Sequence, residues 1–300
     1  MSRERKGHPI QLVINDASTF LNTGVTIQFE IEDENKKMHL YGKCIGEELD
    51  GAPLGFPGYK FLIRGGSDIA GFPHIKGVPG PQLKEVLKSK PPGYRPRKYK
   101  IEKKTGGYKI INLKKVKRKK TVRGEELSER TRQVNLTIME RTGKNIEEMT
   151  EDEIMSDKIL AEIAHKMGKI VMKWGLDAPQ IVENGEKKPL RNKLEEAGLQ
   201  ADNIHLIYKK IGVKLLKLGN DRKKIIEPLK RVSRKNPHPL GKYIAQITYQ
   251  LYKQIKNNEK DTSNPEQLSE EFANQIIEGT KKWLNNQLEK IKFNLNIKEE

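Results

Sequence analysis

The sequence has very little cysteine: Cys44 is the only one among 300 residues. One thiol cannot build a disulfide framework or a zinc site rich in cysteine, so a reducing cytoplasm is the expected compartment. Long apolar runs are also missing, because no stretch approaches the roughly 20 residues that span a bilayer. The opening residues, MSRERKGHP, carry charge without a following apolar segment, so no signal peptide is expected.

Recognisable catalytic motifs are missing as well. The sequence contains neither the phosphate loop of nucleotide-binding enzymes nor the G-x-S-x-G turn that carries a serine nucleophile. No two of its histidines have a spacing typical of metal ligands, and these are His8, His39, His74, His165, His205 and His238. His165 and His205 fall in helical patterns and are expected at the surface or the core edge. The residues therefore show no catalytic constellation, and no cofactor, metal ion or small-molecule substrate is expected.

Positive charge is abundant. The chain has 58 lysines and arginines against 40 acidic residues, for a net charge of +18. Such an excess favours a polyanionic partner, because each cation that meets a phosphate releases a counterion. A membrane surface is a poorer candidate than a nucleic acid, since the sequence has no basic amphipathic anchor. Nucleic-acid binding is therefore the function that composition favours.

The positive charge is most one-sided between Lys84 and Arg123, where Glu85 and Glu102 are the only acids. A solvated face normally mixes both signs, so this stretch favours a surface for RNA phosphates. Tyr94, Tyr99 and Tyr108 lie among the cations and offer rings on which unpaired bases can stack. The candidate RNA-binding residues are Arg64, Lys84, Lys88, Lys90, Tyr94, Arg95, Arg97, Lys98, Lys100, Lys114, Lys115, Lys117, Arg118, Lys119, Lys120 and Arg123.

The N-terminal half shows the alternation of half-buried strands. Strands are expected in the segments IQLVIND (10–16), VTIQFEIED (25–33), YKFLIR (59–64) and VNLTIM (134–139). Glycine and proline punctuate the sequence between these segments. Several short strands separated by turns predict a small β-barrel or a curled sheet.

The stretch FLIRGGSDIAGFP, residues 61–73, has the composition of a shaped turn. Paired glycines allow positive φ or a close backbone approach, and an aspartate can accept backbone N–H bonds. The expected turn residues are Gly65, Gly66, Asp68, Gly71 and Pro73. A structural role is the first interpretation of this turn, and phosphate binding by its backbone amides and Arg64 is the second.

The C-terminal half has a helical period. Apolar stripes predict helices over about 156–175, 190–198, 204–219, 222–232, 240–255 and 264–291. Ser156 is the expected N-cap of the first and Gly175 its stop, while Pro228 predicts a kink or a break. The sequence thus predicts an α+β protein with a β-barrel domain at 1–143, a linker at 144–155 and a helical bundle at 156–300.

Several N-terminal segments also resemble a known family. Residues 63–74, IRGGSDIAGFPH, are similar to a signature that ends in G-G-x-D-x-x-G-x-P-M, with His74 in place of the methionine. The segments GKCIGEELDG, GYRPRK and KRKKTVRGEELSERTRQVNLTIM follow the same pattern. Together they cover about residues 8–143 and resemble small-subunit ribosomal protein six of archaea and eukaryotes, the e-type family.

The resemblance implies a small β-barrel that binds ribosomal RNA and lies among neighbouring ribosomal proteins in the cytoplasm. It also implies no enzymatic activity. The sequence ends in KFNLNIKEE, without the basic, serine-terminated tail of eukaryotic members, so the core is archaeal-like. The segment from Thr150 resembles no family. Two hypotheses therefore stay open: a structural ribosomal protein with an extension, or a ribosome-associated factor or fusion whose helical domain has a separate regulatory or enzymatic role.

Overall fold

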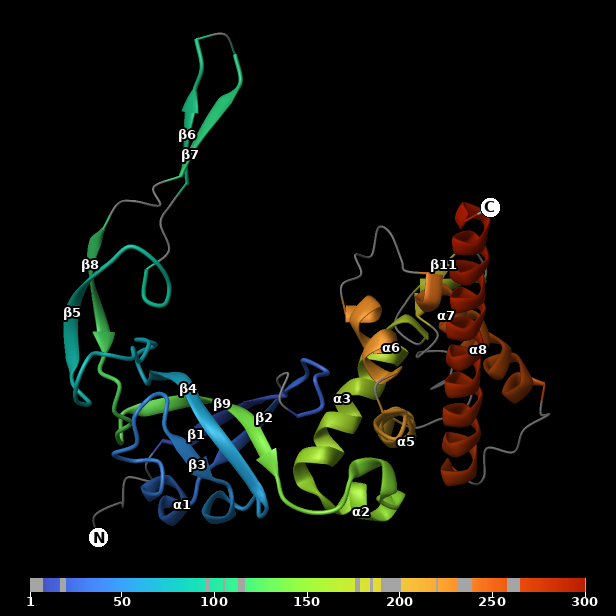
Figure 1. Cartoon of the computed structure of the whole chain (residues 1–300), viewed down its shortest axis with the longest axis horizontal. Coiled ribbons are helices and arrows are strands. Elements are labelled where there is room, and N and C mark those ends of the chain that lie inside the picture. The colour runs from blue at the N-terminus through green and yellow to red at the C-terminus, as the bar shows by residue number, and fades with distance from the viewer. Residues whose placement is uncertain are drawn as a thin grey trace. The chain divides into compact units, whose positions relative to one another are not determined.

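A computed structural model of the chain divides it into two compact units, Met1–Thr142 and Gly143–Glu300 (Figure 1). They are called the N-terminal unit and the C-terminal unit below. The structure describes residues 8–16, 20–94, 98–104, 106–112, 117–175, 179–183, 186–189, 201–219, 221–230, 239–257 and 265–299. None of the helices in these ranges is long and apolar enough to cross a membrane.

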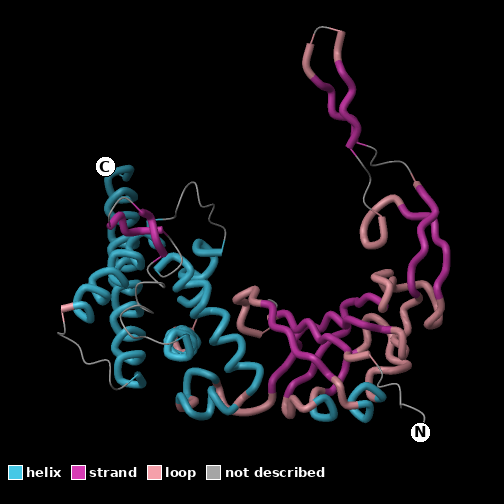
Figure 2. Tube along the Cα trace, turned by 180° about the vertical axis from the view of Figure 1, so that it is seen from behind, coloured by secondary structure: helices cyan, strands magenta, loops and turns pink. Residues whose placement is uncertain are grey.

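The N-terminal unit is built on a five-stranded sheet of order β2-β1-β9-β4-β3, drawn in magenta in Figure 2. The strands are β1 (Ile10–Asn15), β2 (Thr26–Ile31), β3 (Glu48–Asp50), β4 (Tyr59–Asp68) and β9 (Thr131–Arg141). β1 pairs with β9 in parallel, and the other neighbours are antiparallel. The short helices α1 (Glu34–Met38) and η1 (Ala52–Leu54) belong to the same unit.

Alternating apolar side chains explain this sheet. Val134, Leu136 and Ile138 on β9 are fully buried, as are Phe61 and Ile63 on β4. Successive side chains of a strand point to opposite faces, so such a stripe places one face of the sheet against the core. The four strands expected from the sequence are therefore present as β1, β2, β4 and β9.

The expected barrel is not confirmed. In the part of the chain that the structure describes, the sheet is open, and β2 and β3 form its two edges. The pattern of short strands and turns is shared by barrels and open sheets, and only strand pairing distinguishes them. What the structure shows is an α+β protein with an N-terminal sheet and C-terminal helices.

Two further strand pairs come from the basic stretch, where no strands were predicted. β5 (Leu83–Lys88) pairs with β8 (Arg118–Arg123), and β6 (Lys98–Glu102) pairs with β7 (Tyr108–Asn112), both antiparallel. The first pair is called the ribbon and the second the hairpin. Neither pair is hydrogen-bonded into the five-stranded sheet within the described residues.

The C-terminal unit is mainly helical. Its elements are η2 (Ile146–Glu148), α2 (Glu151–Ser156), α3 (Lys158–Gly175), β10 (Pro179–Glu183), β11 (Glu186–Pro189), α5 (Ala201–Leu216), α6 (Asp221–Lys230), α7 (Pro239–Lys256) and α8 (Pro265–Glu299). The antiparallel pair of β10 and β11 was not expected in this half. The helix expected at 190–198 lies outside the described residues.

Several helix boundaries differ from the expectation. The segment expected to be a linker holds η2 and most of α2, which begins with a capping box between Thr150 and Glu153. Asp157, not Ser156, caps α3, because its Oδ1 accepts the backbone N–H groups of Ile159 and Leu160 at 3.0 and 3.2 Å. Helix α6 continues through Pro228 instead of breaking there.

The crossing of α3 and α5 depends on two glycines. A Cβ added at Gly168 would lie 1.9 Å from the carbonyl oxygen of Tyr208, and one at Gly212 would lie 1.8 Å from that of Ala164. The two helix backbones therefore touch at this crossing, and no larger residue fits there. Around it, Ile163, with no exposed surface, and other apolar residues form the core that the stripes predicted.

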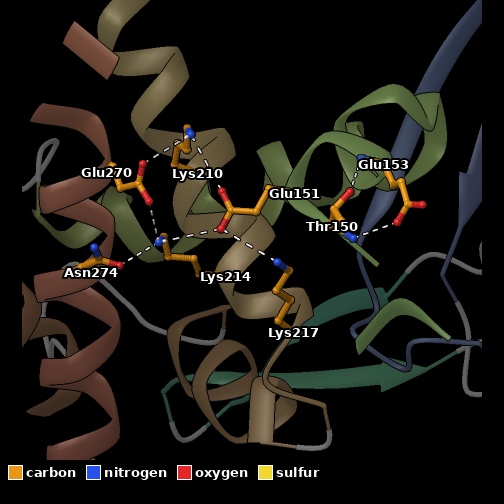
Figure 3. Close-up of polar contacts among 8 residues, drawn as sticks. All are labelled: Thr150, Glu151, Glu153, Lys210, Lys214, Lys217, Glu270 and Asn274. Carbon is orange, nitrogen blue, oxygen red and sulfur yellow. Dashed lines mark hydrogen bonds and ion pairs between the residues drawn. The ribbon is translucent and has the colours of Figure 1, made fainter. Parts of the chain in front are cut away.

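An ionic cluster links three helices of this unit (Figure 3). The Glu151 carboxylate, at the start of α2, lies 3.8 Å from Lys210 and Lys214 on α5 and 4.0 Å from Lys217, just after the end of that helix. Glu270 on α8 lies 3.5 Å from Lys214 and 3.8 Å from Lys210. Lys210 and Lys214 are four residues apart, so they share one face of α5 and hold α2 and α8 against it.

Candidate nucleic-acid interface

The register of the ribbon sorts its cations onto two faces. Directly paired residues share a face, and the pairs alternate between the faces along the two strands. The pairs Lys84–Val122, Val86–Lys120 and Lys88–Arg118 lie on one face. The pairs Leu83–Arg123, Glu85–Thr121 and Leu87–Lys119 lie on the other. We call the first the basic face, because its charged members are Lys84, Lys88, Arg118 and Lys120.

The cations of the basic face reach solvent, although Val122 on the same face is fully buried. Lys84, Arg118 and Lys120 are exposed and Lys88 is half-buried. No carboxylate forms an ion pair with any of these four in the described part of the chain; Lys84 instead donates to the carbonyl of Pro79 at 2.7 Å. Like charges directly opposite one another, as at Lys88 and Arg118, repel unless an anion lies between them. The face is therefore suited to bind phosphates.

The opposite face of the ribbon has a different chemistry. Leu83 and Leu87 are 42% and 61% exposed, and Glu85 between them is also exposed. Lys119 belongs to this face, although the sequence groups it with its neighbours Arg118 and Lys120. The unbroken basic run KRKK is therefore divided by the strand alternation, which a linear charge count does not show.

Arg123 does not belong with the solvent-exposed cations. It is buried, and its Nε and Nη2 donate to Asp68 Oδ2 at 3.2 and 2.8 Å. Its Nη1 donates to the carbonyl of Pro81 at 3.0 Å. All three guanidinium nitrogens thus donate a hydrogen bond, and Arg123 fixes the base of the ribbon to the end of β4.

Tyr94 also differs from the exposed residues around it. Its side chain is buried at 8% exposure, and the Lys120 ammonium lies 5.9 Å from its ring centroid. The ring supports a cation of the basic face through a cation–π contact and has no open face for a base. Tyr94 therefore contributes to the interface through Lys120.

The remaining predicted residues are distributed over several elements. Lys90 and Lys117 are exposed, Lys90 just after β5 and Lys117 just before β8. Lys98 and Lys100 lie on β6, opposite Asn112 and Ile110 of β7. Four of the predicted residues lie outside the described part of the chain, namely Arg95, Arg97, Lys114 and Lys115.

The glycine-rich stretch is only partly a turn. β4 runs through Gly65 and Gly66 to Asp68, so these glycines belong to a strand, and neither has positive φ. At Gly66 a Cβ would lie 2.4 Å from the carbonyl oxygen of Gln133 on β9, so the close approach of two strands explains this glycine. The register of β4 shifts between Ile63 and Gly65, which leaves exposed Arg64 at a β-bulge of the five-stranded sheet.

The turn itself spans Asp68 to Phe72. Asp68 Oδ1 accepts the backbone N–H of Phe72 at 2.7 Å, as expected of a turn aspartate. Gly71 has φ of +84°, a conformation that side chains rarely adopt. Pro73 follows, and its carbonyl accepts the N–H of Arg123 at 3.0 Å. The stretch therefore holds the sheet and the ribbon together.

His74 occupies a buried polar position beside this turn. Its Nδ1 lies 2.7 Å from the carbonyl oxygen of Gly124 and its Nε2 lies 3.2 Å from Thr131 Oγ1. A carbonyl only accepts, so Nδ1 donates the proton and Nε2 accepts from the hydroxyl. Burial lowers the pKa of His74, and the hydrogen bond to Gly124 offsets this in part. The neutral imidazole is thus held by two hydrogen bonds.

His165 and His205 meet where α3 crosses α5, which the sequence did not predict. Their rings stack with centroids 5.3 Å apart, and both contact the ring of Tyr208. His165 is half-buried and His205 exposed, which agrees with the expected positions at the surface and the core edge. Among the described residues, no three histidine, cysteine or acidic side chains are grouped to hold a metal ion.

Comparison with known proteins identifies the N-terminal unit. A model of the family described as Ribosomal protein S6e matches residues 11–151. A small ribosomal subunit protein eS6 from Methanocaldococcus jannaschii is 36% identical over 121 residues, which cover 40% of this chain and 79% of that protein. The chain belongs to the ribosomal protein S6e family.

Two other relatives with the same name show the extent of the similarity. The protein from Natronomonas pharaonis is 30% identical over 139 residues, or 46% of this chain and 92% of that protein. The protein from Hyperthermus butylicus is 43% identical over 100 residues, but these cover only 33% of this chain and 39% of that protein. The S6e family match ends at Glu151, so nearly all of the helical C-terminal unit lies beyond it.

Proposed function

We propose that this chain is a structural protein of the small ribosomal subunit that binds ribosomal RNA and supports assembly of the subunit. Membership of the S6e family supports this role, since the relatives are named as small-subunit proteins. The observation that carries RNA binding is the basic face, with four cations on one side of the ribbon. Its location is then the ribosome in the cytoplasm, beside neighbouring ribosomal proteins, and it needs neither a catalytic site nor a cofactor.

RNA phosphates suit this surface better than base edges do. Lysines and arginines on a flat ribbon contact phosphates without reading sequence, and those contacts set orientation and affinity. A-form RNA also hides its base edges in a deep, narrow major groove, so proteins bind RNA helices mainly by shape and backbone. We therefore propose that the basic face binds the phosphate backbone of an rRNA helix, with Lys90 and Lys117 beside it.

The C-terminal unit is proposed to be an extension that folds on its own and contacts RNA or a neighbouring protein. Its buried residues include Met167, Ile211 and Phe272, each without exposed surface. An arm that orders only on RNA does not need such a core, whereas burial of apolar surface, at about 25 cal/mol per Å², offsets chain entropy. The family gives this unit no role, so a separate regulatory role stays the alternative.

The salt dependence of RNA binding tests the proposed function. A quadruple variant, with Lys84, Lys88, Arg118 and Lys120 each changed to Gln, is compared with the full chain on small-subunit rRNA. Each lost phosphate contact lowers the slope of log affinity against log salt by about 0.7 to 0.9, so the variant's slope is expected to fall by about three. A matched control neutralises four lysines of the N-terminal unit outside the ribbon and the hairpin, and it is expected to leave the slope nearly unchanged; these are Lys36, Lys43, Lys60 and Lys76. A flat salt response in the unchanged chain would contradict the proposal.

A further inference from the structure

The hairpin ends in a compact, exposed tip. Glu102 closes β6 and Tyr108 opens β7, and the two are direct partners in the register. The intervening turn is closed by two backbone hydrogen bonds, from Lys103 N to the Gly107 carbonyl at 2.9 Å and from Gly106 N to the Lys103 carbonyl at 3.0 Å. We define the hairpin tip as its described members: Glu102, Lys103, Lys104, Gly106, Gly107 and Tyr108.

Every residue of the hairpin tip is exposed, and Tyr108 is the most informative of them. Its side chain is 64% exposed, whereas Tyr94, in the same basic stretch, is 8% exposed. The hairpin makes no strand pairing with the rest of the described N-terminal unit, so no sheet covers the tip. A large aromatic ring held in solvent by a tight turn is preorganised for a planar partner, because little side-chain entropy is lost on contact.

The charges around the ring select the chemistry of that partner. Lys103 and Lys104 in the turn supply two cations for phosphates. Glu102 lies directly opposite Tyr108 and repels a phosphate at the ring itself. A nucleobase has an uncharged face that can stack on the ring while its flanking phosphates reach the lysines. A ring flanked in this way suits an unpaired nucleotide better than a duplex, whose bases are already stacked.

We propose that the hairpin tip binds an unpaired nucleotide of RNA, with the base stacked on Tyr108 and the flanking phosphates on Lys103 and Lys104. This inference rests on the proposed function, because it divides rRNA recognition between two surfaces. The basic face of the ribbon binds phosphates of a helix. The hairpin tip adds a stacking contact with an unpaired base, which a fully paired RNA helix does not offer.

The test uses the full-length chain and two labelled probes, a short single-stranded oligoadenylate and a blunt RNA duplex of the same length. Fluorescence anisotropy gives the affinity for each probe at several salt concentrations. Tyr108→Leu is expected to weaken oligoadenylate binding by about 5- to 150-fold, as is typical for loss of one base–aromatic stack, and to leave the salt slope unchanged. Duplex binding is expected to stay within about twofold of the unchanged chain.

Three further variants make the result specific. Tyr108→Phe keeps the ring and is expected to bind oligoadenylate as the unchanged chain does. Lys104→Gln is expected to lower the salt slope by about 0.7 for the single strand. Tyr249→Leu is the matched control, because Tyr249 on α7 also lies beside a lysine, with Lys253 5.0 Å from its ring centroid. That control is expected to leave both affinities unchanged.

Several outcomes would overturn the inference without touching the proposed function. Oligoadenylate binding by Tyr108→Leu within twofold of the unchanged chain would show that the ring carries no base. Equal losses on single strand and duplex would show that the hairpin tip does not select unpaired nucleotides. An equal loss in Tyr108→Phe would assign the contact to the hydroxyl instead of the ring face. Failure of the unchanged chain to bind either probe or rRNA would instead contradict the proposed function itself.

Discussion

Arg123 and Asp68 form a buried ion pair, with Nη2 of Arg123 2.8 Å from Oδ2 of Asp68 and side-chain exposures of 8% and 2%. Asp68 ends β4 in the five-stranded sheet and Arg123 ends β8 in the ribbon. The other carboxylate oxygen of Asp68 accepts the N–H of Phe72. One aspartate thus fixes both the glycine-rich turn and the base of the basic face.

Removing one member of this pair is expected to be costly. Asp68→Asn leaves the Arg123 guanidinium buried without a counter-charge, and breaking a buried pair in this way typically costs about 3–5 kcal/mol. Hydrogen exchange of the β4 and β9 amides in the full chain measures the loss. As a control, Glu140→Gln breaks the exposed pair between Lys60 and Glu140 and is expected to leave the exchange unchanged. Similar exchange in the two variants would contradict the structural role of Asp68.

Two adjacent glycines of β4 are expected to respond oppositely to alanine. Gly66→Ala places a Cβ 2.4 Å from the carbonyl oxygen of Gln133, so a strand must shift, at a cost of about 1–3 kcal/mol. Gly65→Ala meets no atom within 4 Å and needs no positive φ, so stability is expected to be unchanged or to rise by about 0.4–1 kcal/mol. The hydrogen-exchange protection of the β9 amides is measured in both variants to compare their stability. Equal losses in the two variants would show that the close approach at Gly66 is not what requires glycine.

His74 is expected to make the N-terminal unit less stable in mild acid. Because burial lowers the pKa of His74, the unfolded chain binds the proton more readily than the folded one. Its contribution is therefore fully present above the unfolded pKa of about 6.5 and is lost as pH falls below that value.

A methionine at position 74 tests this pH dependence. His74→Met is expected to show a smaller loss of β9 exchange protection between about pH 7.5 and about pH 5 than the unchanged chain. His39→Gln removes an exposed histidine and serves as the control. The interpretation fails if His74→Met keeps the full pH dependence of the unchanged chain.

The strands of the main sheet were predictable because their side chains alternate. The apolar residues Val134, Leu136 and Ile138 recur with period two, and β9 buries all three completely. The ribbon was not predicted, because four of the six residues of Arg118–Arg123 are cations and Lys84–Lys88 mixes two lysines with Glu85, which hides the strand period. Charge alone therefore located the basic stretch but did not show that Lys119 and Lys120 point to opposite faces.

The candidate site was predictable in composition and not in detail. Arg123 and Tyr94 have the residue types of an RNA surface, yet burial gives them structural contacts. Nothing in the sequence next to Arg123 reveals its partner Asp68, which lies 55 positions away. The same limit applies to Gly168 and Gly212, whose close helix contact depends on which helices cross.

The glycine crossing of α3 and α5 is expected to be essential to the C-terminal unit. Gly168→Ala and Gly212→Ala each place a Cβ within 2 Å of a facing carbonyl oxygen, so the helices must separate. Loss of more than about 3 kcal/mol is expected, since backbone cannot yield as a side chain does. Gly279→Ala is the control, because its Cβ meets side-chain atoms and no backbone, with the terminal carbon of Ile247 at 2.3 Å and Cε1 of Tyr243 at 3.4 Å.

Tryptophan fluorescence reports this unit alone, because Trp174 and Trp283 are the only tryptophans of the chain. Urea unfolding followed at these residues is expected to have a lower midpoint urea concentration for both crossing variants. The midpoint is expected to fall less for Gly279→Ala. A midpoint for Gly168→Ala equal to that of the unchanged chain would contradict the close crossing.

Co-sedimentation with the small ribosomal subunit tests the central claim most directly. A tagged full-length chain, expressed in an archaeal host, is followed through a sucrose gradient after a high-salt wash. A structural protein of the subunit is held by many phosphate contacts at once, so we predict that the chain stays in the small-subunit peak. Complete release of the chain to the top of the gradient, with the small subunit otherwise intact, would contradict a structural role and favour a ribosome-associated factor.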